Sequence, residues 1–165
     1  MNIVCVETAR CIACLSCQRV CFFHQNEVNH CHTANIRVHV DMEKRRILTT
    51  TCRQCEKAEC MSVCPPEAIT RDQVTGVVII DKSICIGCGL CVAACPYGAV
   101  QLDDIQQVAT KCDLCGGRPI CVDVCMARAL HFCSVEALVG MKREQKDLKI
   151  GIRAVPMEKD GHDDG

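Results

Sequence analysis

Sixteen of the 19 cysteines in this 165-residue chain are grouped in four runs with short gaps between their members. In each run three cysteines lie close together, and a fourth follows the third after three intervening residues. The four runs consist of Cys11, Cys14, Cys17 and Cys21; Cys52, Cys55, Cys60 and Cys64; Cys85, Cys88, Cys91 and Cys95; and Cys112, Cys115, Cys121 and Cys125. Thiolates are soft ligands that bind zinc and iron–sulfur clusters. A [4Fe–4S] cluster takes four cysteine ligands, so the runs predict four such clusters.

The spacing within the second and third runs indicates that they exchange ligands. The third run has the pattern C-x2-C-x2-C-x3-C-P, and the second run also ends in x3-C-P, with Pro65. In bacterial runs of this kind the fourth cysteine binds the other cluster of a two-cluster unit. A short helix carries that cysteine away from the first three, and the proline ends the helix. We therefore expect these two runs to interlock. The fourth run departs from the pattern, because Gly-Gly-Arg-Pro lengthens its second gap and Met126 replaces the proline.

Short β-rich segments precede the runs and must position them. Residues 3–7 predict a strand that leads into the first run, and residues 76–81 predict a strand that leads into the third. Residues 37–41 and 46–50 are β-rich and flank a charged turn, so they predict a hairpin that delivers the chain to the second run.

Three further cysteines lie outside the runs. Cys5 falls in the predicted strand over residues 3–7, where it is interpreted as a small buried hydrophobe. Cys133 is interpreted as a buried thiol, with a substitute-ligand role as the less favoured alternative. Cys31 lies in the histidine-rich stretch 24–32, but no second thiolate follows at metal-site spacing, so a surface loop is favoured over a metal site. In the remaining alternative, one of these histidines donates a hydrogen bond to a cluster sulfur.

The composition limits the aliphatic core and the choice of partners. Aromatic residues make up only 2% of the chain, so bound clusters must supply much of the folding energy, and we expect the cluster-free chain not to fold. The formal net charge of −1 falls to about −9 when sixteen thiolates and four oxidised clusters are counted, which argues against nucleic acid as a partner. No segment has the length of a membrane span and the N-terminus does not resemble a signal sequence, so we expect a cytoplasmic protein without membrane insertion, from an anaerobic cell. A disulfide framework is disfavoured, because it needs an oxidising compartment.

With all four runs in place, the sequence resembles the four-cluster, ferredoxin-type electron-transfer subunits of molybdenum and tungsten oxidoreductases. The resemblance extends from Cys11 to about Leu130. Within that family, three segments look most like the small subunits that accompany tungsten aldehyde oxidoreductases: Ala34-Asn-Ile-Arg-Val-His-Val, Thr51-Cys-Arg-Gln-Cys and Lys111-Cys-Asp-Leu-Cys-Gly-Gly.

The resemblance also implies which cysteines share a cluster, because in that family the outer runs pair with each other and the inner runs pair likewise. The implied sets are Cys11, Cys14 and Cys17 with Cys125; Cys112, Cys115 and Cys121 with Cys21; Cys52, Cys55 and Cys60 with Cys95; and Cys85, Cys88 and Cys91 with Cys64. Met126 and the lack of a proline after Cys21 are departures that concern only the outer pair.

The expected fold class is α+β, with a duplicated bacterial ferredoxin-like arrangement of two two-cluster modules, in which the outer runs pair around the inner pair. Short hairpins, a C-terminal helix that begins at the N-cap residue Ser134 and a polar tail complete the chain. The expected divisions are a four-cluster domain over residues 1–133, with an inner module at about 50–100 and an outer module from 1–32 and 108–133, a C-terminal helix over 134–146 and a tail over 147–165.

The implied function is electron transfer. Clusters bound by cysteine at every iron have no open coordination site, so we do not expect the chain to be an enzyme on its own. We expect it to relay single electrons between a large tungsten or molybdenum catalytic subunit, with the aldehyde-oxidoreductase type favoured, and a flavin subunit or other acceptor. Copies of the chain that stack into a filament are a related expectation.

Three alternatives stay open. The chain is a free soluble polyferredoxin shuttle, or it serves a hydrogenase, formate dehydrogenase, carbon monoxide dehydrogenase or benzoyl-CoA reductase complex, or it is a zinc-binding interaction module. Three closely spaced cysteines followed by x3-Cys-Pro favour iron–sulfur clusters over zinc.

Overall fold

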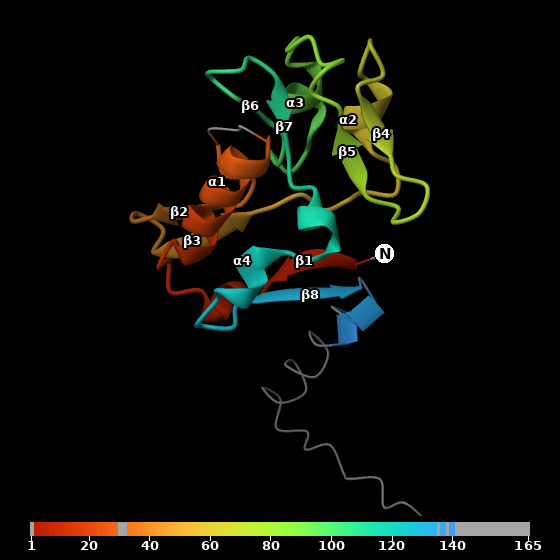
Figure 1. Ribbon diagram of the computed structural model, residues 1–165. Coiled ribbons are helices and arrows are strands. Elements are labelled where there is room, and N and C mark those ends of the chain that lie inside the picture. The colour runs from red at the N-terminus through yellow and green to blue at the C-terminus, as the bar shows by residue number, and fades with distance from the viewer. Residues whose placement is uncertain (1, 30–32, 135, 138, 141–165) are drawn as a thin grey trace, which may run out of the picture.

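The computed structural model describes residues 2–29, 33–134, 136, 137, 139 and 140. Short strands and helices alternate along these residues, which confirms the mixed helix and strand content (Figure 1). The strands are β1 (Asn2–Val6), β2 (Arg37–Asp41), β3 (Arg46–Thr50), β4 (Ile69–Arg71), β5 (Val78–Ile80), β6 (Gln101–Leu102), β7 (Ala109–Thr110) and β8 (Leu130–Ser134). The helices are α1 (Ser16–Asn29), α2 (Glu59–Ser62), α3 (Leu90–Ala94) and α4 (Ile120–Asp123), with 3-10 turns η1 (Thr8–Arg10) and η2 (Leu114–Gly117).

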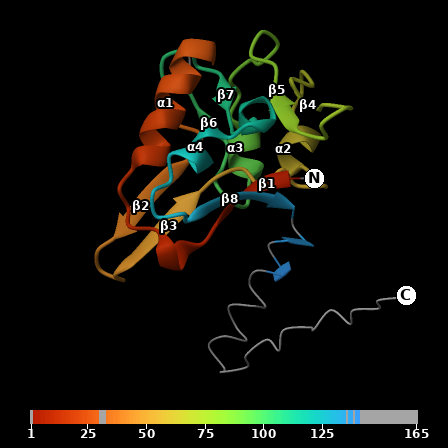
Figure 2. The ribbon, with the colours of Figure 1, turned by 60° about the horizontal axis from the view of Figure 1, so that its bottom comes forward.

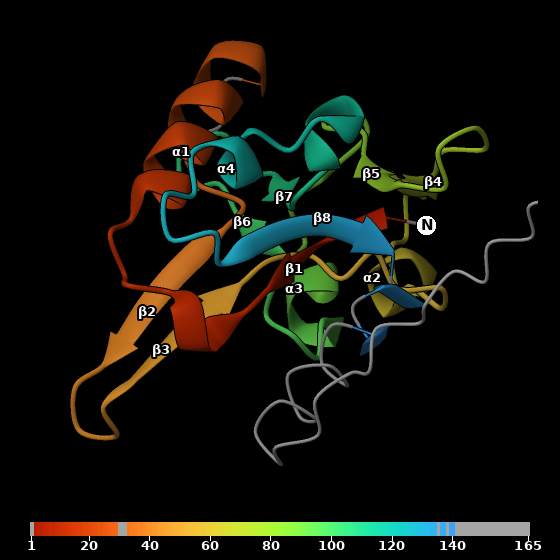
Figure 3. The same ribbon diagram turned by 90° about the horizontal axis from the view of Figure 1, so that it is seen from below.

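Strands β1 and β8 bring the two ends of the described chain together in one antiparallel sheet. The pairing runs from Asn2 opposite Ser134 to Val6 opposite Leu130. Figure 3 shows the two strands side by side along their whole length. Val4 is fully buried, so this terminal sheet contributes to the core as well as holding the ends of the chain.

The C-terminal helix was expected to begin at Ser134, but Ser134 is the last residue of β8. Its hydroxyl accepts a hydrogen bond of 3.2 Å from the backbone N–H of Ala137, as an N-cap side chain does. Residues 136, 137, 139 and 140 are helical. Most of the expected helix over 134–146 and all of the expected tail over 147–165 lie outside the described residues.

The hairpin expected over residues 37–50 is confirmed, with β2 pairing antiparallel to β3. Asp41 closes its charged turn, because one carboxylate oxygen accepts from the backbone N–H of Lys44 at 2.9 Å and the other accepts from Arg46 Nε at 3.3 Å. The hairpin lies on one side of the molecule and leads the chain toward the second cysteine run (Figure 1).

Helix α1 corrects the interpretation of residues 24–29 as a surface loop. These residues continue the helix that begins at Ser16, and Gln25 within it is buried. The helix persists because it packs against α4, which lies beside it in Figure 2. The three remaining residues of the stretch, 30–32, lie outside the described residues, so the expectation for Cys31 is not tested.

Two small hairpins follow the second and third cysteine runs and have the same turn. Asp72 closes the β4–β5 hairpin, where its backbone N–H donates to Val77 O at 2.9 Å. Asp103 closes the β6–β7 hairpin, where its N–H donates to Val108 O at 2.9 Å. The side chain of each aspartate also accepts from backbone N–H groups of its own turn. Each hairpin therefore closes on itself and delivers the chain to the next run.

The described residues bury two small hydrophobic clusters that contain more cysteine than aromatic residues. One cluster includes Val4, Ile36 and Leu114 together with Cys112 and Cys121. The other cluster includes residues of the β4–β5 and β6–β7 hairpins and consists of Ala58, Ile69, Val78, Cys91, Val100 and Ala109. Within the part of the chain that the structure describes, no helix is long and apolar enough to cross a membrane.

Candidate cluster-binding sites

The four cysteine runs share one backbone feature. In each run, the residue just before the second cysteine has a positive φ, which turns the loop back on itself. These residues are Ala13 (φ 53°), Gln54 (φ 49°), Gly87 (φ 66°) and Leu114 (φ 60°). Left-handed residues of this kind turn successive backbone N–H groups toward the inside of the loop, where they form a concave site for anionic groups. A cluster with its bound thiolates is such a group.

Gly87 shows how closely the third run is packed against the β6–β7 hairpin. A Cβ atom added at Gly87 would lie 2.0 Å from the backbone oxygen of Gln107. Real Cβ atoms do not approach a backbone oxygen so closely, and the positive φ also favours glycine. This position therefore requires glycine.

A short helix separates the third and fourth cysteines of the later runs, as the sequence predicts. In the second run α2 ends just before Cys64, in the third run α3 ends just before Cys95, and in the fourth run α4 is followed by Cys125. A left-handed residue follows each of these cysteines after a short turn: Glu67 (φ 54°), Gly98 (φ 58°) and Arg128 (φ 48°). The repeated turn directs the fourth cysteine away from its own run.

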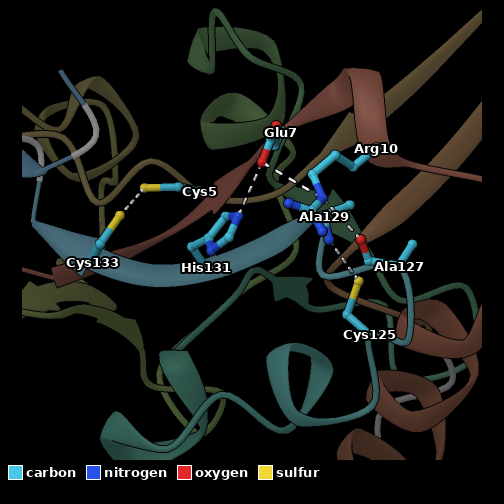
Figure 4. A network of polar contacts seen from close by, with 8 residues as sticks. All are labelled: Cys5, Glu7, Arg10, Cys125, Ala127, Ala129, His131 and Cys133. Atoms are coloured by element: carbon cyan, nitrogen blue, oxygen red, sulfur yellow. Dashed lines mark hydrogen bonds and ion pairs between the residues drawn. The ribbon is translucent and has the colours of Figure 1, made fainter. Parts of the chain in front are cut away.

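Set A consists of Cys11, Cys14 and Cys17 of the first run and Cys125 of the fourth. These four side chains line one small cavity. Burial, together with the neighbouring thiols of Cys11, Cys125 and Cys14, raises the pKa of Cys17 to about 11. The sulfur of Cys125 accepts a hydrogen bond of 3.3 Å from the backbone N–H of Ala129 (Figure 4).

Set B consists of Cys21 of the first run and Cys112, Cys115 and Cys121 of the fourth. Burial raises the pKa of Cys121, and the thiols of Cys112, Cys21 and Cys115 act in the same direction. The backbone N–H of Asn35 donates a hydrogen bond of 3.3 Å to the sulfur of Cys21.

Set C consists of Cys52, Cys55 and Cys60 of the second run and Cys95 of the third, and its members line one cavity. Burial raises the pKa of Cys60, and the thiols of Cys52, Cys95 and Cys55 act in the same direction. The backbone N–H of Ala99 donates a hydrogen bond of 3.3 Å to the sulfur of Cys95.

Set D consists of Cys64 of the second run and Cys85, Cys88 and Cys91 of the third. Burial, together with the thiols of Cys85, Cys64 and Cys88, raises the pKa of Cys91 to about 11. The backbone N–H of Ala109 donates a hydrogen bond of 3.3 Å to the sulfur of Cys85. Sets A and C each line one cavity, and in sets B and D the thiols that raise the pKa of Cys121 and Cys91 come from the same pairs of runs. The division of the sixteen cysteines into four ligand sets stays a prediction of the family resemblance.

Electrostatic effects between thiols link set A to set B and set B to set C. Cys17 of set A raises the pKa of Cys121 in set B, and Cys52 of set C raises the pKa of Cys112 in set B, in each case after burial, which is the larger cause. Sets C and D are joined because α2 packs against α3, and these helices lie within the two runs that the sets share. Of the sixteen run cysteines, the exposed ones are Cys14 and Cys88, one at each end of this series.

Two buried polar side chains connect set C to set B, and sequence reasoning missed both. The ammonium of Lys111 donates to the backbone oxygens of Val78 and Cys112, the latter at 3.0 Å. The amide of Gln54 accepts from the backbone N–H of Val78 at 2.9 Å and donates to Cys112 O at 2.8 Å. Lys111 is only 5% exposed. A lysine directly before a cysteine run and after an apolar strand is the one sequence signal for such a buried cation.

The donor set fits iron–sulfur clusters. Each set consists of cysteines only. Backbone N–H groups donate hydrogen bonds to the sulfurs of Cys21, Cys85, Cys95 and Cys125. Within the described residues, no three His, Cys, Asp or Glu side chains converge closely enough to hold a single metal ion. The ligands of a [4Fe–4S] cluster need not converge in that way, because each thiolate binds a different iron.

A family model described as "4Fe-4S dicluster domain" matches residues 43–135. The thiosulfate reductase electron transfer subunit PhsB of Salmonella typhi is 33% identical, in an alignment that covers 96% of this chain and 93% of that protein. The ferredoxin-like protein YdhX of Escherichia coli (strain K12) is 36% identical, in an alignment that covers 76% of this chain and 62% of that protein.

Among solved structures, a chain of the active site complex BamBC of benzoyl coenzyme A reductase in complex with benzoyl-CoA matches with a TM-score of 0.44 and 18% identity. The match covers 92% of this chain and 95% of that chain. The family assignment rests on the family model and on the relative PhsB.

Proposed function

The chain belongs to the family of 4Fe–4S dicluster, ferredoxin-type proteins, and from this premise we propose that it is an electron-transfer subunit that holds four [4Fe–4S] clusters. A [4Fe–4S] cluster supplies one-electron redox chemistry when bound. The sixteen run cysteines hold these clusters, one in each of sets A to D. The single observation that supports this assignment is that two cavities are each lined by three cysteines of one run and the fourth cysteine of another, Cys125 in one and Cys95 in the other.

The repeated turns support a duplicated arrangement of two modules. Glu67 and Gly98, which follow the two runs of the inner module, and Arg128, which follows the fourth run in the outer module, occupy equivalent left-handed positions after the fourth cysteine. The inner module holds sets C and D at about residues 50–100, and the outer module holds sets A and B with residues 1–32 and 108–133. Together they form one four-cluster domain over residues 1–133.

The backbone around each set tunes the bound group. An N–H group that donates to a ligating sulfur stabilises the added negative charge of the reduced state, and so raises the reduction potential. The N–H groups of Asn35, Ala99, Ala109 and Ala129 serve this role in sets B, C, D and A, and in set C the N–H of Gln54 also donates to Cys52 at 3.4 Å. Because these donors belong to the backbone, their orientation is fixed by the fold.

The exposed apolar side chains favour a subunit over a free shuttle. At the set A end, Ile12 and Met126 are 64% and 79% exposed, and at the set D end Ile86 is 67% exposed. Each of these residues neighbours a run cysteine in sequence. Exposed apolar side chains beside the cysteines at the two ends of an electron path suit contacts with partner subunits. Through these ends the chain connects a catalytic subunit to an electron acceptor and has no catalytic site of its own.

The partner class follows from the family resemblance. We favour a large tungsten or molybdenum catalytic subunit of the aldehyde-oxidoreductase type, a flavin subunit or other acceptor, and stacking of further copies at the two ends, in the cytoplasm. The relative PhsB is by name the electron transfer subunit of a thiosulfate reductase, which supports the subunit role. The second candidate is a free polyferredoxin.

The test is anaerobic affinity purification of the tagged chain from its native host, with iron, zinc, tungsten and molybdenum measured on one sample. We expect about 16 irons per chain and a co-purifying large subunit that contains tungsten or molybdenum. The same iron content without a partner would favour the free shuttle, and zinc in place of iron would contradict the cluster assignment.

Substitutions at the two ends test the docking argument. We expect Ile12→Asp and Ile86→Asp each to reduce recovery of one partner without changing the iron content. Val74→Asp is the matched control, because Val74 is 94% exposed in the β4–β5 turn and is not next to any cysteine. Equal loss of partners in all three variants would contradict docking at the ends.

A further inference from the structure

The sulfur atoms of Cys5 and Cys133 lie 2.8 Å apart (Figure 4). Neither cysteine belongs to the four runs, so neither has a part in the proposed cluster sites. The two sulfurs of a disulfide are about 2.05 Å apart. Bond formation therefore needs the two sulfurs to approach each other by less than about 1 Å.

The terminal sheet holds the two thiols in this position. Cys133 of β8 lies opposite Ile3, and Cys5 of β1 lies opposite His131. Residues two apart along a strand point to the same face, so Cys5 and Cys133 are diagonal neighbours on one face of the sheet. The ladder continues beyond β1, where Glu7 N donates to Ala129 O at 2.7 Å. The pair is therefore held by a continuous set of backbone hydrogen bonds.

The two thiols differ in access to solvent. Cys5 is fully buried, with 0% of its surface exposed, whereas Cys133 is partly exposed. Of the two cysteines, only Cys133 has surface in contact with solvent. This asymmetry separates an attacking thiol from a resolving thiol, as in two-cysteine redox pairs.

We propose that Cys5 and Cys133 form a reversible disulfide with a low-molecular-weight disulfide as the oxidant. The Cys133 thiolate attacks one sulfur of the oxidant, which forms a mixed disulfide and releases one thiol. The Cys5 thiolate then attacks the Cys133 sulfur and releases the second thiol. Two cysteine thiols lose two electrons and two protons, and the oxidant becomes two thiols. In a reducing compartment the pair is a dithiol, and the bond forms when the thiol–disulfide balance becomes oxidising.

The bond would lock the two ends of the described chain, because its partners are 128 residues apart. Strand β1 leads through η1 to Cys11, and β8 follows Cys125 after a short turn. Both of these cysteines belong to set A. The disulfide therefore links the two strands that adjoin the ligands of set A. It slows the separation of these strands, and with it the loss of iron from that set. This effect on iron rests on the proposed function, whereas formation of the bond does not.

The experiment uses the anaerobically purified, cluster-loaded Cys31→Ser protein, in which Cys5 and Cys133 are the only cysteines outside the runs. The protein is incubated with glutathione disulfide, unfolded in the presence of an alkylating agent and mapped by mass spectrometry. We expect two fewer alkylated thiols than in the untreated protein and a linked peptide that contains Cys5 and Cys133. A dithiol reductant should reverse both changes.

Two variants in the same background separate the attacking and the resolving thiol. In Cys5→Ser, Cys133 should keep the glutathione adduct, and in Cys133→Ser, Cys5 should stay reduced. A stable adduct on Cys133 in the presence of Cys5, an unreactive pair, or a link from Cys133 to a run cysteine would each overturn the proposal.

The rate at which a chelator removes iron tests the consequence. Iron removal should be slower by about threefold or more in the oxidised Cys31→Ser protein than in the reduced one, because the bond closes a long loop. In the Cys133→Ser variant, the oxidant should not change the rate of iron removal. If the disulfide forms but iron loss is not slower, the stabilising effect on set A is contradicted, whereas formation of the Cys5–Cys133 disulfide is not. An iron content near zero in the untreated protein would instead contradict the proposed function.

Discussion

The side-chain amide of Gln54 donates a hydrogen bond of 2.8 Å to the backbone oxygen of Cys112. Gln54 lies between the first two cysteines of set C, and Cys112 is the first cysteine of the fourth run, in set B. The bond is buried, since Gln54 is only 1% exposed. It joins the second cysteine run to the fourth across 58 positions of the chain.

Replacement of Gln54 tests this joint. Gln54→Ala leaves the N–H of Val78 and the oxygen of Cys112 without these partners, so we expect the free energy of unfolding to fall by about 2–4 kcal/mol. The measurement is loss of cluster absorbance in denaturant under anaerobic conditions. Gln107→Ala is the control, because Gln107 is exposed and also has a positive φ, of 55°; it should change the free energy by no more than about 0.5 kcal/mol. Equal effects of the two variants would show that the buried bonds contribute nothing.

The buried ammonium of Lys111 should raise the reduction potential at set C. It opposes the effect of burial on the pKa of Cys60, so its charge acts at the cysteines of that set. Lys111→Met removes the charge that stabilises the more negative reduced state, and we expect a fall in one potential on the order of 50 mV. Potentiometric titration followed by electron paramagnetic resonance measures the shift.

Lys57 provides the control for Lys111. It lines the same cavity but is exposed, so solvent and salt screen its charge. Lys57→Met should leave the potential within experimental error. If Lys57→Met shifted the reduction potential as much as Lys111→Met does, burial would not explain the effect of Lys111 on that potential.

The crossed sets predict which thiols are released when one fourth cysteine is removed. In Cys64→Ala, set D loses one member, so Cys85, Cys88 and Cys91 should react with an alkylating agent under native conditions. In Cys95→Ala, the reactive cysteines should instead be Cys52, Cys55 and Cys60. Peptide mapping after native alkylation distinguishes the two outcomes. If Cys64→Ala released the cysteines of its own run, the crossed assignment would be wrong.

Gly87 should not tolerate a side chain. A Cβ atom there meets the Gln107 oxygen at 2.0 Å, so we expect Gly87→Ala to reduce the iron content of the purified protein and to destabilise it by more than about 2 kcal/mol. Gly116→Ala is matched in backbone conformation, with a φ of 64°, but nothing lies within 4 Å of its added Cβ. It should cost only about 1 kcal/mol. Similar behaviour of the two variants would indicate that φ alone, and not the contact, decides the requirement for glycine.

The sequence predicts best what is local. The hairpin over 37–50 is readable because two β-rich segments flank a charged turn, and the short ligand helices are readable because the x3 spacing is followed in two runs by proline. Strand β8 was missed because its partner β1 is at the other end of the described chain, and a strand of five residues has no signal of its own. Helix α1 was missed beyond Cys21 because His, Gln and Asn suggest a loop, whereas packing against α4 maintains the helix.

The candidate sites divide in the same way. Cysteine spacing predicts the sixteen run cysteines, and in the structure two groups of four of them each line one cavity. Spacing does not reveal Lys111 or Gln54, because their importance comes from burial between segments that are far apart in the chain. Cys5 was expected to be buried and it is, but its contact with Cys133 depends on the register of the terminal sheet, which no local pattern specifies.

The crossing of the runs has a consequence for biosynthesis. Sets C and D are complete once the growing chain has passed Cys95, so iron and sulfur can be loaded there while the ribosome is still at work. Sets A and B must wait for Cys125 and Cys121, because the first run contributes ligands that have no partners until the fourth run emerges. During that interval Cys11, Cys14, Cys17 and Cys21 are open to any oxidant or stray metal. In the proposed assignment, the outer clusters therefore cannot be inserted before the fourth run is synthesised, and a truncated translation product that ends between the third and fourth runs would have ligands only for the inner two clusters.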